Sequence, residues 1–396
     1  MKKCLIFLLL ICLFSLSSCK NKNCNKPMSP IDIKNQYSTH RQDYYDYLDT
    51  ISYVLVEYDK TKINEAEVKE DLKKVENILF NIEVEFAKEQ TDWMKIKEIE
   101  KSTTMIVNEN SGIAPVKVSK EYINVLKKAI SISSKTSGGF DVTVGPLTSL
   151  WDIPARAEYC NLMNDQHCEI PSEEEINETL KLVNYENIII DENENTVFLK
   201  EKGMMLDFGA IAKGYAADKV LEHLLKDAYT YISINLGGNV VVSGKTYLYN
   251  QYTTTSDIVP IGIENPYYAK FRELTVMNVN ETNVTVVASG VSKRYIEVVN
   301  PETNKLETYH HIINPLTGYP YENEIETITV ITQSSMEADG LSTGIFSLGL
   351  EQGIKYLQDN NLKGIFITKD YKIYIVGNID YTLKEGVQNE YTIITK

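Results

Sequence analysis

The sequence has too little positive charge to favour a nucleic-acid partner. Its 396 residues include 40 Lys and Arg against 55 Asp and Glu, and the formal net charge at pH 7 is −15. Such an acidic chain repels the phosphate backbones of DNA and RNA, so no binding to nucleic acid is expected. A phosphorylated small ligand would need local basic groups or a metal ion to hold it.

The sequence also lacks a complete phosphate loop where one is first suggested. In MLDFGAIAKGYAAD, residues 205–218, Lys213 precedes Gly214, whereas the P-loop order GxxxxGK[ST] places the lysine after the second glycine. The stretch fails the dinucleotide fingerprint GxGxxG as well. It still leads from an apolar strand through a turn into a helix, whose N-terminal N–H groups suit phosphate oxygens. The alternative is that Asp207 is only a structural cap.

Long apolar runs are scarce, and the run at the N-terminus is short. Residues 4–14 are all apolar and follow two lysines, which is typical of a signal peptide and too short for a comfortable membrane helix. The run closes on LSSC, which resembles a bacterial lipobox, so we predict a lipoprotein signal peptide at residues 1–18 and lipidation of Cys19. The protein would then lie outside the cytoplasm, anchored to a bacterial membrane by lipid. An ordinary secreted protein with a chance cysteine is the alternative.

Few cysteines remain in the mature chain. Two of the six lie in the predicted signal peptide, and Cys19 would carry lipid, which leaves Cys24, Cys160 and Cys168. Cys160 and Cys168 flank a short polar loop, and an oxidising compartment favours a disulfide between them. A zinc site that uses His167 is the alternative, but it lacks ligands at usable spacing.

The rest of the chain divides into a stalk and one folded domain. Residues 19–48 are polar and irregular, which predicts a lipidated N-terminus with a flexible stalk. Residues 49–396 begin with the alternating strand ISYVLVEYD and continue with both helical and strand patterns, which predicts an α+β domain of mixed, largely antiparallel sheets packed with helices. Helices are expected to begin near residue 64 and to cover about 119–136, 213–226 and 335–348.

Glycine-containing clusters outside these periodic patterns are the candidate site. They cover residues 138–147, 205–218, 233–239, 288–295 and 311–318 with 338–344. Glycines beside Phe140 and Asp141 permit a ligand to approach the backbone closely, and Phe140 with Trp151 could line an aromatic pocket. The alternative for that cluster is a helix end that enters a buried strand.

The last cluster contains two oxygen ligands suited to a metal ion. Asp339 and Thr343 are four residues apart, so on a helix their oxygens would share one face. A carboxylate and a hydroxyl are hard ligands that Mg²⁺ prefers, with waters and substrate phosphates completing the octahedron. The alternative is that Asp339 is a helix N-cap.

Taken together, these clusters resemble the ApbE family of periplasmic flavin transferases. The matching stretches, in family order, are GGFDVTVGPLTSLW, LDFGAIAKGYAAD, INLGGNV, IGIENP, ASGVSKRYIE, HHIINPLTGYP and EADGLSTGIFSLG. The resemblance implies a single catalytic domain that transfers FMN from FAD to a Ser or Thr of a target flavoprotein and releases AMP. Some members mainly hydrolyse FAD, so an FAD pyrophosphatase is one alternative, and a non-catalytic flavin-binding lipoprotein is another.

The resemblance also implies roles for individual residues. The positions that match FAD contacts in the family are Gly139, Phe140, Asp141, Asp207, Lys213 and Ile313. The implied Mg²⁺ ligands are the backbone carbonyl of Ala210 and the side chains of Asp339 and Thr343. His311 matches a histidine proposed to deprotonate the acceptor hydroxyl, so His311 and Asp339 are the implied catalytic residues.

Two features depart from the family pattern, and one absence bears on the partner. Asn314 stands where Asp is usual, and residues 91–112 are longer than the corresponding family stretch, so no N-terminal FAD contacts are transferred. The chain also lacks the family's acceptor motif, a Ser/Thr-Gly-Ala-Ser/Thr run. It should therefore be the donor enzyme, and the implied acceptors are extracytoplasmic subunits of Rnf- or Nqr-type electron-transfer complexes or other FMN-bearing domains.

Overall fold

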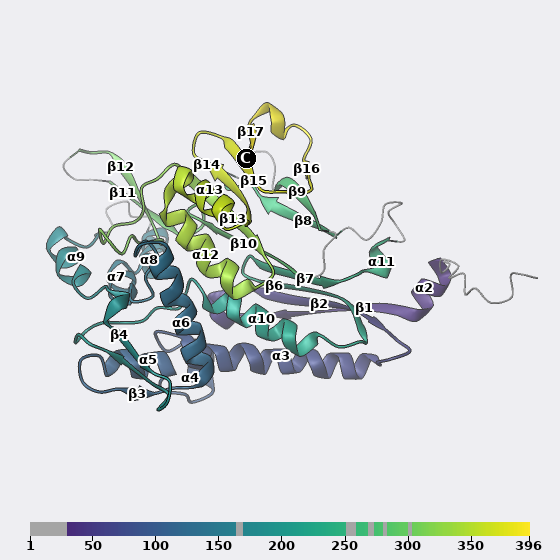
Figure 1. Cartoon of the computed structure of the whole chain (residues 1–396), viewed down its shortest axis with the longest axis horizontal. Coiled ribbons are helices and arrows are strands. Elements are labelled where there is room, and N and C mark those ends of the chain that lie inside the picture. The colour runs from purple at the N-terminus through teal and green to yellow at the C-terminus, as the bar shows by residue number, and fades with distance from the viewer. Residues whose placement is uncertain (1–29, 164–168, 251–258, 268–272, 280–282, 300–302) are drawn as a thin grey trace, which may run out of the picture.

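A nine-stranded sheet forms the centre of the molecule (Figure 1). The computed structural model describes residues 30–396 apart from 164–168, 251–258, 268–272, 280–282 and 300–302. Neighbouring strands are antiparallel except for the parallel pair at one edge, β15 and β17. In sheet order the strands are β1 (Tyr37–Tyr44), β2 (Ser52–Asp59), β6 (Tyr229–Leu236), β7 (Asn239–Gly244), β10 (Val284–Gly290), β13 (Ile325–Thr332), β14 (Lys363–Thr368), β15 (Lys372–Val376) and β17 (Thr392–Thr395).

Helices cover one face of this sheet, and a small sheet covers the other. Successive strand residues point to opposite faces, so Val241 belongs to the core beneath the helices and Val242 to the core beneath the small sheet. The helices are α3 (Glu65–Phe86), α6 (Lys120–Lys135), α10 (Ala212–Leu224), α12 (Ser335–Ser347) and α13 (Gly349–Asp359). The small sheet consists of β8 (Val259–Glu264), β9 (Glu273–Val279) and β16 (Tyr381–Leu383).

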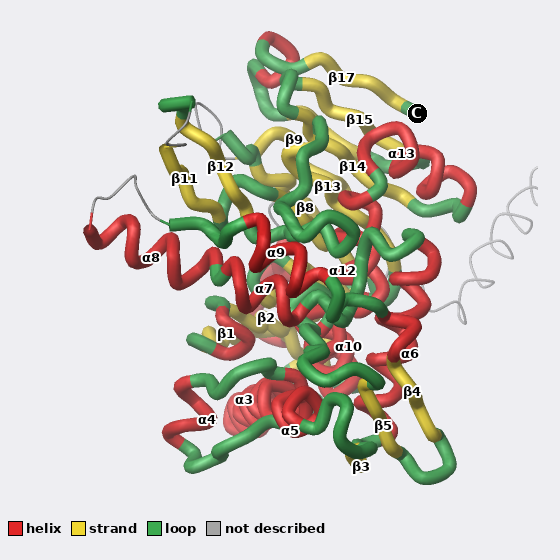
Figure 2. The backbone as a smooth tube through the Cα atoms, turned by 90° about the vertical axis from the view of Figure 1, so that its left-hand side faces the viewer, coloured by secondary structure: helices red, strands yellow, loops and turns green. Residues whose placement is uncertain are grey.

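A third apolar cluster lies to one side of the central sheet, where a group of helices meets a two-stranded hairpin (Figure 2). This group consists of α7 (Gly145–Trp151), α8 (Ile153–Met163), α9 (Glu173–Leu180), β11 (Tyr295–Val299) and β12 (Leu306–His310). The remaining elements are α2 (Pro30–Gln36), η1 (Tyr47–Asp49), α4 (Asp92–Ile96), α5 (Thr103–Glu109), β3 (Val116–Lys117), η2 (Tyr185–Asn187), β4 (Ile188–Asp191), β5 (Thr196–Leu199), α11 (Tyr247–Asn250) and η3 (Val387–Asn389).

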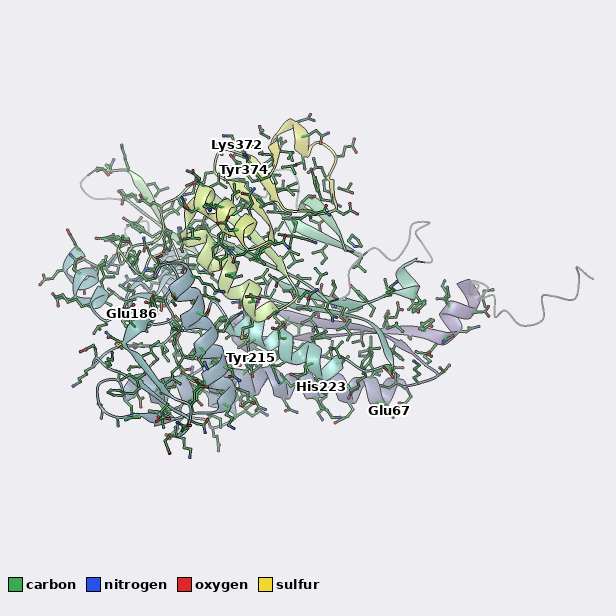
Figure 3. The ribbon with its side chains drawn as sticks, viewed as in Figure 1. Glu67, Glu186, Tyr215, His223, Lys372 and Tyr374 are labelled. Atoms are coloured by element: carbon green, nitrogen blue, oxygen red, sulfur yellow. The ribbon has the colours of Figure 1, made fainter. Side chains whose placement is uncertain are left out.

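The expected helices form where the sequence places them. Asn64 caps α3 in a capping box with Glu67, and Ser119 caps α6, so local side chains satisfy the free N–H groups at both starts. Two contacts then join α3 to α10: Tyr215 packs edge-on against Phe86, and His223 Nε2 lies 3.2 Å from the Asp71 carbonyl oxygen. Figure 3 labels Tyr215 and His223 on α10. The predicted α+β class with largely antiparallel sheets is confirmed.

One boundary differs from the prediction. Residues 37–44, assigned above to the stalk, form the edge strand β1 and pair with β2 over eight positions. Only the terminal tyrosines of β1 are buried, and its polar middle is typical of an edge strand, which is why the stretch reads as a stalk in the sequence. The domain therefore begins before residue 49. Within the described residues, no helix is long and apolar enough to cross a bilayer.

Candidate functional site

Helices α10 and α12 lie side by side, and each supplies a carboxylate to the N-terminal turn of the other. Asp218 of α10 accepts hydrogen bonds from the N–H groups of Ser335 and Met336 at 2.7 and 3.0 Å. Asp339 of α12 accepts one from the N–H of Gly214 through Oδ2 at 2.8 Å. A Cβ on Gly214 would lie 2.2 Å from the carbonyl oxygen of Ser335, so the close approach requires glycine. The second glycine of the phosphate-loop-like stretch thus permits helix packing.

The Asp339 side chain is buried, and only one of its two carboxylate oxygens has a hydrogen-bond donor among the described residues. Asp339 is 4% exposed, and its Oδ1 accepts no hydrogen bond from any part of the chain that the structure describes. The N-cap of α12 is Ser334, so the alternative that Asp339 caps its own helix is wrong. One carboxylate oxygen is therefore fixed by α10, while the other can ligate a cation.

Two further oxygens suit the same cation. Thr343 lies one turn after Asp339 in α12, so their side chains share a face of the helix. The carbonyl of Ala210 accepts no hydrogen bond from the described residues, because the N–H of Gly214, its usual partner four residues on, donates to Asp339 instead. A carboxylate, a hydroxyl and a carbonyl are the ligand types that Mg²⁺ takes. The residues present thus fit the ion that the family resemblance implies.

A metal at this place would depend on that mixed set of ligands. Among the described residues, no group of three or more His, Cys, Asp or Glu side chains could hold a metal ion. The predicted alternative of zinc at His167 lies outside the described residues, as do Cys19, Cys24 and Cys168. Cys160 is disulfide-bonded.

A partly buried ion pair holds the turn before α10. Asp207 accepts a hydrogen bond from the Thr148 hydroxyl at 2.7 Å and pairs with Lys88 at 3.2 Å through Oδ2, and Oδ1 accepts from the Gly209 N–H at 2.8 Å. Burial alone would raise the pKa of Asp207, but Lys88 and these hydrogen bonds outweigh it and lower the pKa. The carboxylate is therefore charged and shapes the turn. The Lys213 ammonium donates to the Gly209 carbonyl at 2.9 Å and adds a positive charge there.

The first two glycine clusters lie next to each other. The Asp207 N–H donates to the Val142 carbonyl at 2.8 Å, and Val144 forms a parallel bridge with Met205. A Cβ on Gly145 would lie 2.6 Å from the Met205 carbonyl oxygen, so this approach of the two segments requires glycine at position 145. These contacts bring two of the stretches that match the family to the same place.

The loop at Gly139 lies against the C-terminal end of α12. A Cβ on Gly139 would lie 2.3 Å from the hydroxyl oxygen of Ser347, and the Tyr321 hydroxyl donates to the Gly139 carbonyl at 2.7 Å. Gly344 of the same helix faces Phe140, with 3.8 Å between an added Cβ and the Phe140 Cβ. Helix α12 therefore carries the candidate ligands Asp339 and Thr343 and also packs through Gly344 and Ser347 against the loop at Gly139.

Asp141 has no free carboxylate oxygen to offer a ligand. Its Oδ1 accepts from both the N–H and the hydroxyl of Thr143 at 2.7 Å, and its Oδ2 accepts from the Tyr185 N–H at 2.9 Å. Burial raises its pKa, against the effect of these bonds. The role that this geometry supports for Asp141 is to hold the Gly139 loop in shape.

The apolar residues of the predicted pocket are mostly buried. Trp151 is 0% exposed, and its indole N–H donates to the Gly318 carbonyl at 2.7 Å, so the hypothesis that it lines an aromatic pocket is wrong. Phe140 is 5% exposed, and its N–H donates to the Thr136 hydroxyl at 3.1 Å, so little of this residue is open to a ligand. Ile313 is 6% exposed and packs in the same cluster as Trp151.

His311 is held as a neutral base. Its Nδ1 lies 3.2 Å from the Arg294 carbonyl oxygen, which can only accept, so Nδ1 carries the proton and Nε2 is the nitrogen that can accept one. Burial, and next the positive charge of Arg294, lower the pKa of His311 to about 4, and Lys213 acts in the same direction. The ring is therefore neutral at pH 7, as a group that accepts a proton must be.

His310 has a structural role beside it. Its Nε2 donates to the Tyr321 carbonyl at 2.8 Å, and its Nδ1 accepts from the Ile312 N–H at 3.2 Å. Both ring nitrogens are thus engaged in holding the loop that carries Gly318 and Tyr321. Burial lowers the pKa of His310 to about 4.

We expect a His310→Gln substitution to reduce the acid sensitivity of the fold. The unfolded chain binds the proton at an ordinary pKa of about 6.5, above the folded pKa of about 4. The stability that this group contributes is therefore complete above about pH 6.5 and is lost as the pH falls toward about 4. Chemical unfolding of both proteins between about pH 7 and about pH 4.5 should show the wild type losing more free energy of unfolding. If the wild type and His310→Gln lost the same free energy of unfolding over this pH range, His310 would not be the group responsible for the acid sensitivity.

Comparison with known proteins gives the family. The model of the ApbE family matches residues 58–366. This chain belongs to the ApbE family. A curated FAD:protein FMN transferase from Klebsiella pneumoniae (strain 342) is 32% identical over 275 residues, which cover 69% of this chain and 77% of that protein. A second, from Treponema pallidum (strain Nichols), is 27% identical over 279 residues, which cover 69% and 72%.

Solved ApbE structures share the fold. The flavin transferase ApbE from Vibrio cholerae superposes with a TM-score of 0.66 at 20% identity, over 89% of this chain and 99% of that one. The ApbE protein from Thermotoga maritima gives a TM-score of 0.66 at 24% identity over the same shares. The predicted ApbE membership, the single-domain α+β fold and the prediction of an enzyme are confirmed.

The structure adds residues that the sequence analysis did not select. Asn108 bonds both backbone groups of Leu206, at 2.7 and 3.1 Å, and so fixes the segment that leads to Asp207. Neither Asn108 nor Lys88 stands in a glycine cluster, so no sequence signal indicated them.

Asn314, the departure from the family pattern, accepts the Leu316 N–H at 2.9 Å, a role that an amide oxygen fills as well as a carboxylate.

The third glycine cluster is explained by the fold alone. Gly237 and Gly238 form the two-residue turn between β6 and β7, and both have positive φ values, of 60° and 100°. Such a turn favours glycine because both central residues adopt a left-handed conformation. The turn between the two strands thus accounts for both glycines of this cluster.

Proposed function

We propose that this protein transfers FMN from FAD to a Ser or Thr hydroxyl of an extracytoplasmic flavoprotein, with Mg²⁺ and with release of AMP. The observation that carries the proposal is the buried carboxylate of Asp339, in which Oδ2 accepts from the Gly214 N–H of α10 and Oδ1 accepts no hydrogen bond from the described residues. Its neighbours in the fold, Thr343 and the Ala210 carbonyl, complete a set of hard oxygen ligands. The names of the curated relatives support the transfer of FMN from FAD to a protein.

The charge of FAD explains why such a set is needed. The diphosphate is anionic and resists attack, and a bound Mg²⁺ would supply neutralisation and alignment worth several kcal/mol of barrier. Asp339, Thr343 and the Ala210 carbonyl would hold that ion. The Lys213 ammonium, placed at the start of α10 beside Gly209, would add a second positive charge for the phosphate oxygens.

The acceptor hydroxyl is activated by His311 in this proposal. The lone pair on Nε2 takes the hydroxyl proton as the oxygen attacks the phosphorus of the FMN half. The bond to the bridging oxygen breaks, and AMP leaves with that oxygen. With a pKa of about 4, His311 would be a weak base. The anionic diphosphate of bound FAD favours the charged imidazolium and therefore raises the pKa of His311. The Arg294 carbonyl, which accepts from Nδ1, stabilises the same cation.

Flavinylation of a separate domain is the direct test. The protein is incubated with FAD, Mg²⁺ and an FMN-bearing domain of an Rnf- or Nqr-type complex, with chelator as control. We expect a fluorescent band at the size of the acceptor that survives denaturation, together with AMP. Free FMN and AMP without a labelled band would indicate an FAD pyrophosphatase. Retained FAD without AMP under any divalent metal would indicate a non-catalytic flavin-binding lipoprotein.

The position of the protein in the cell is part of the proposal. The lipobox-like sequence before Cys19 supports a diacylated N-terminus and a lipid anchor outside the cytoplasm. Incorporation of labelled fatty acid into the wild type, but not into Cys19→Ser, is the expected result. In the same compartment, a Cys160–Cys168 disulfide is expected, and peptide mapping without reductant would detect it.

A further inference from the structure

We propose that Ser289 is a positioning residue that orients the hydroxyl of Thr343 toward the metal ion. The inference rests on the proposed function and extends it to a residue outside the ligand set. Ser289 stands near the end of β10, and Ser342 and Thr343 are consecutive in α12. The Ser289 Oγ lies 2.7 Å from the Ser342 Oγ and 3.1 Å from the Thr343 Oγ1, so one hydroxyl joins the strand to the helix at two points.

The chemistry of these groups fixes the direction of every hydrogen bond. The Ser342 hydroxyl donates to the Asp339 carbonyl oxygen at 2.8 Å, and a carbonyl oxygen can only accept. Since a hydroxyl has one proton, Ser342 must accept in its bond with Ser289, and Ser289 must donate. The proton of Ser289 is then used, so Ser289 accepts from Thr343. These three hydrogen bonds form a relay that runs from the Thr343 hydroxyl through the hydroxyls of Ser289 and Ser342 to the backbone carbonyl of Asp339 in α12.

Because the Thr343 hydroxyl donates its proton to Ser289, its oxygen lone pairs are left for a metal ion. A neutral hydroxyl binds a cation through an oxygen lone pair, and its proton must point away from the positive charge. Ser289 accepts that proton, so the lone pairs of Thr343 are left for the ion before it arrives. Without Ser289, the Thr343 hydroxyl can rotate, and part of the metal-binding free energy is lost in ordering it. Partners of this kind commonly change metal affinity by about 10- to 100-fold.

Direct metal binding tests the proposal without any turnover. Mn²⁺, which takes the same oxygen ligands, is titrated into the full-length protein and the free ion is followed by electron paramagnetic resonance. We expect Ser289→Ala to raise the Mn²⁺ dissociation constant by about tenfold or more. Ser289→Thr, which keeps the hydroxyl and suits a strand, should restore most of the affinity.

A double-substitution cycle shows whether Ser289 acts through Thr343. In a Thr343→Val background the relay has no first hydroxyl, so Ser289→Ala should add little further loss. Ser133→Ala is the matched control, because Ser133 is a buried helix serine that donates to the Ala129 carbonyl at 3.0 Å and is absent from the relay. It should leave Mn²⁺ binding unchanged.

Four results would overturn the inference. Unchanged affinity in Ser289→Ala would remove Ser289 from the metal site, and an equal loss with and without Thr343 would show that it acts by another route. The same loss in Ser133→Ala would indicate general destabilisation, which the melting temperature of each variant would also report. If the wild type itself binds no Mn²⁺ and forms no AMP from FAD, the proposed function fails together with this inference. Wild-type binding with an unaffected Ser289→Ala leaves the proposed function standing.

Discussion

Asp339→Ala is expected to abolish AMP release from FAD while the protein stays folded. The substitution removes the only charged side chain of the proposed ligand set, so the diphosphate charge is uncompensated when the bond breaks. The loss should amount to several kcal/mol of barrier, at least about a hundredfold in rate. It also leaves the Gly214 N–H without its acceptor, which should cost about 0.5–2 kcal/mol of stability. Asp339→Asn should retain a little activity, since an amide oxygen can coordinate without supplying charge.

Asp218→Ala is the matched control for this experiment. Asp218 supplies the reciprocal cap, and both of its oxygens are occupied by the first turn of α12, with bonds to Ser334, Ser335 and Met336. Its loss should lower the stability by a similar amount, about 0.5–2 kcal/mol, and leave AMP release per folded molecule nearly unchanged. Melting temperature and AMP release are measured on the same preparations. Full turnover in a destabilised Asp339→Ala would show that Asp339 is only a cap and would end the metal assignment.

The second large effect is expected for His311→Ala. Loss of a positioned general base should slow transfer to the acceptor by about 10²- to 10⁴-fold. Hydrolysis of FAD should fall less, because water needs less activation geometry than a hydroxyl held on a protein. The labelled acceptor and the AMP formed in one reaction give both rates, so their ratio is the readout.

The adjacent histidine provides the comparison. In His310→Gln the neighbouring base is intact and only the bonds to Tyr321 and Ile312 change, so the ratio of transfer to hydrolysis should stay near that of the wild type. An equal fall of both reactions in His311→Ala would contradict a role in activating the acceptor. It would favour a role for His311 in binding FAD.

Features set by neighbouring residues were predictable from the sequence. The capping box of α3 needs only Asn64 and Glu67, and the start of α6 needs only Ser119, so short-range side-chain chemistry places both helices. Turns and close backbone contacts restrict the residue type strongly, and the fold does bring the glycine clusters at residues 138–147 and 205–218 into contact, through Asp207 and Val142. Strand β1 was missed because an edge strand carries polar residues on most of its length.

Roles that depend on distant partners could not be predicted in the same way. Asp339 meets Gly214 across 125 positions, and Asp207 meets Thr148 across 59, so neither contact leaves a local pattern. The resemblance to the family implies that Asp141 contacts FAD. Only the structure shows that both oxygens of its carboxylate accept hydrogen bonds, from Thr143 and from the Tyr185 N–H. Ser289 stood in a recognised cluster, yet its partner Thr343 lies on another element.

The exchange of carboxylates between α10 and α12 has a consequence for the order of assembly. Residue 214 is synthesised long before residue 339, and the intervening chain contributes β6, β7, β10 and β13, the middle of the sheet. The Gly214 N–H in the first turn of α10 therefore lacks its acceptor, the Asp339 carboxylate, until most of the chain has been synthesised. Contacts between residues so far apart in the sequence form slowly. We expect nascent or truncated chains that end before α12 to have no competent site. An immature chain would thus be unable to bind flavin nucleotide through this arrangement before the domain is complete.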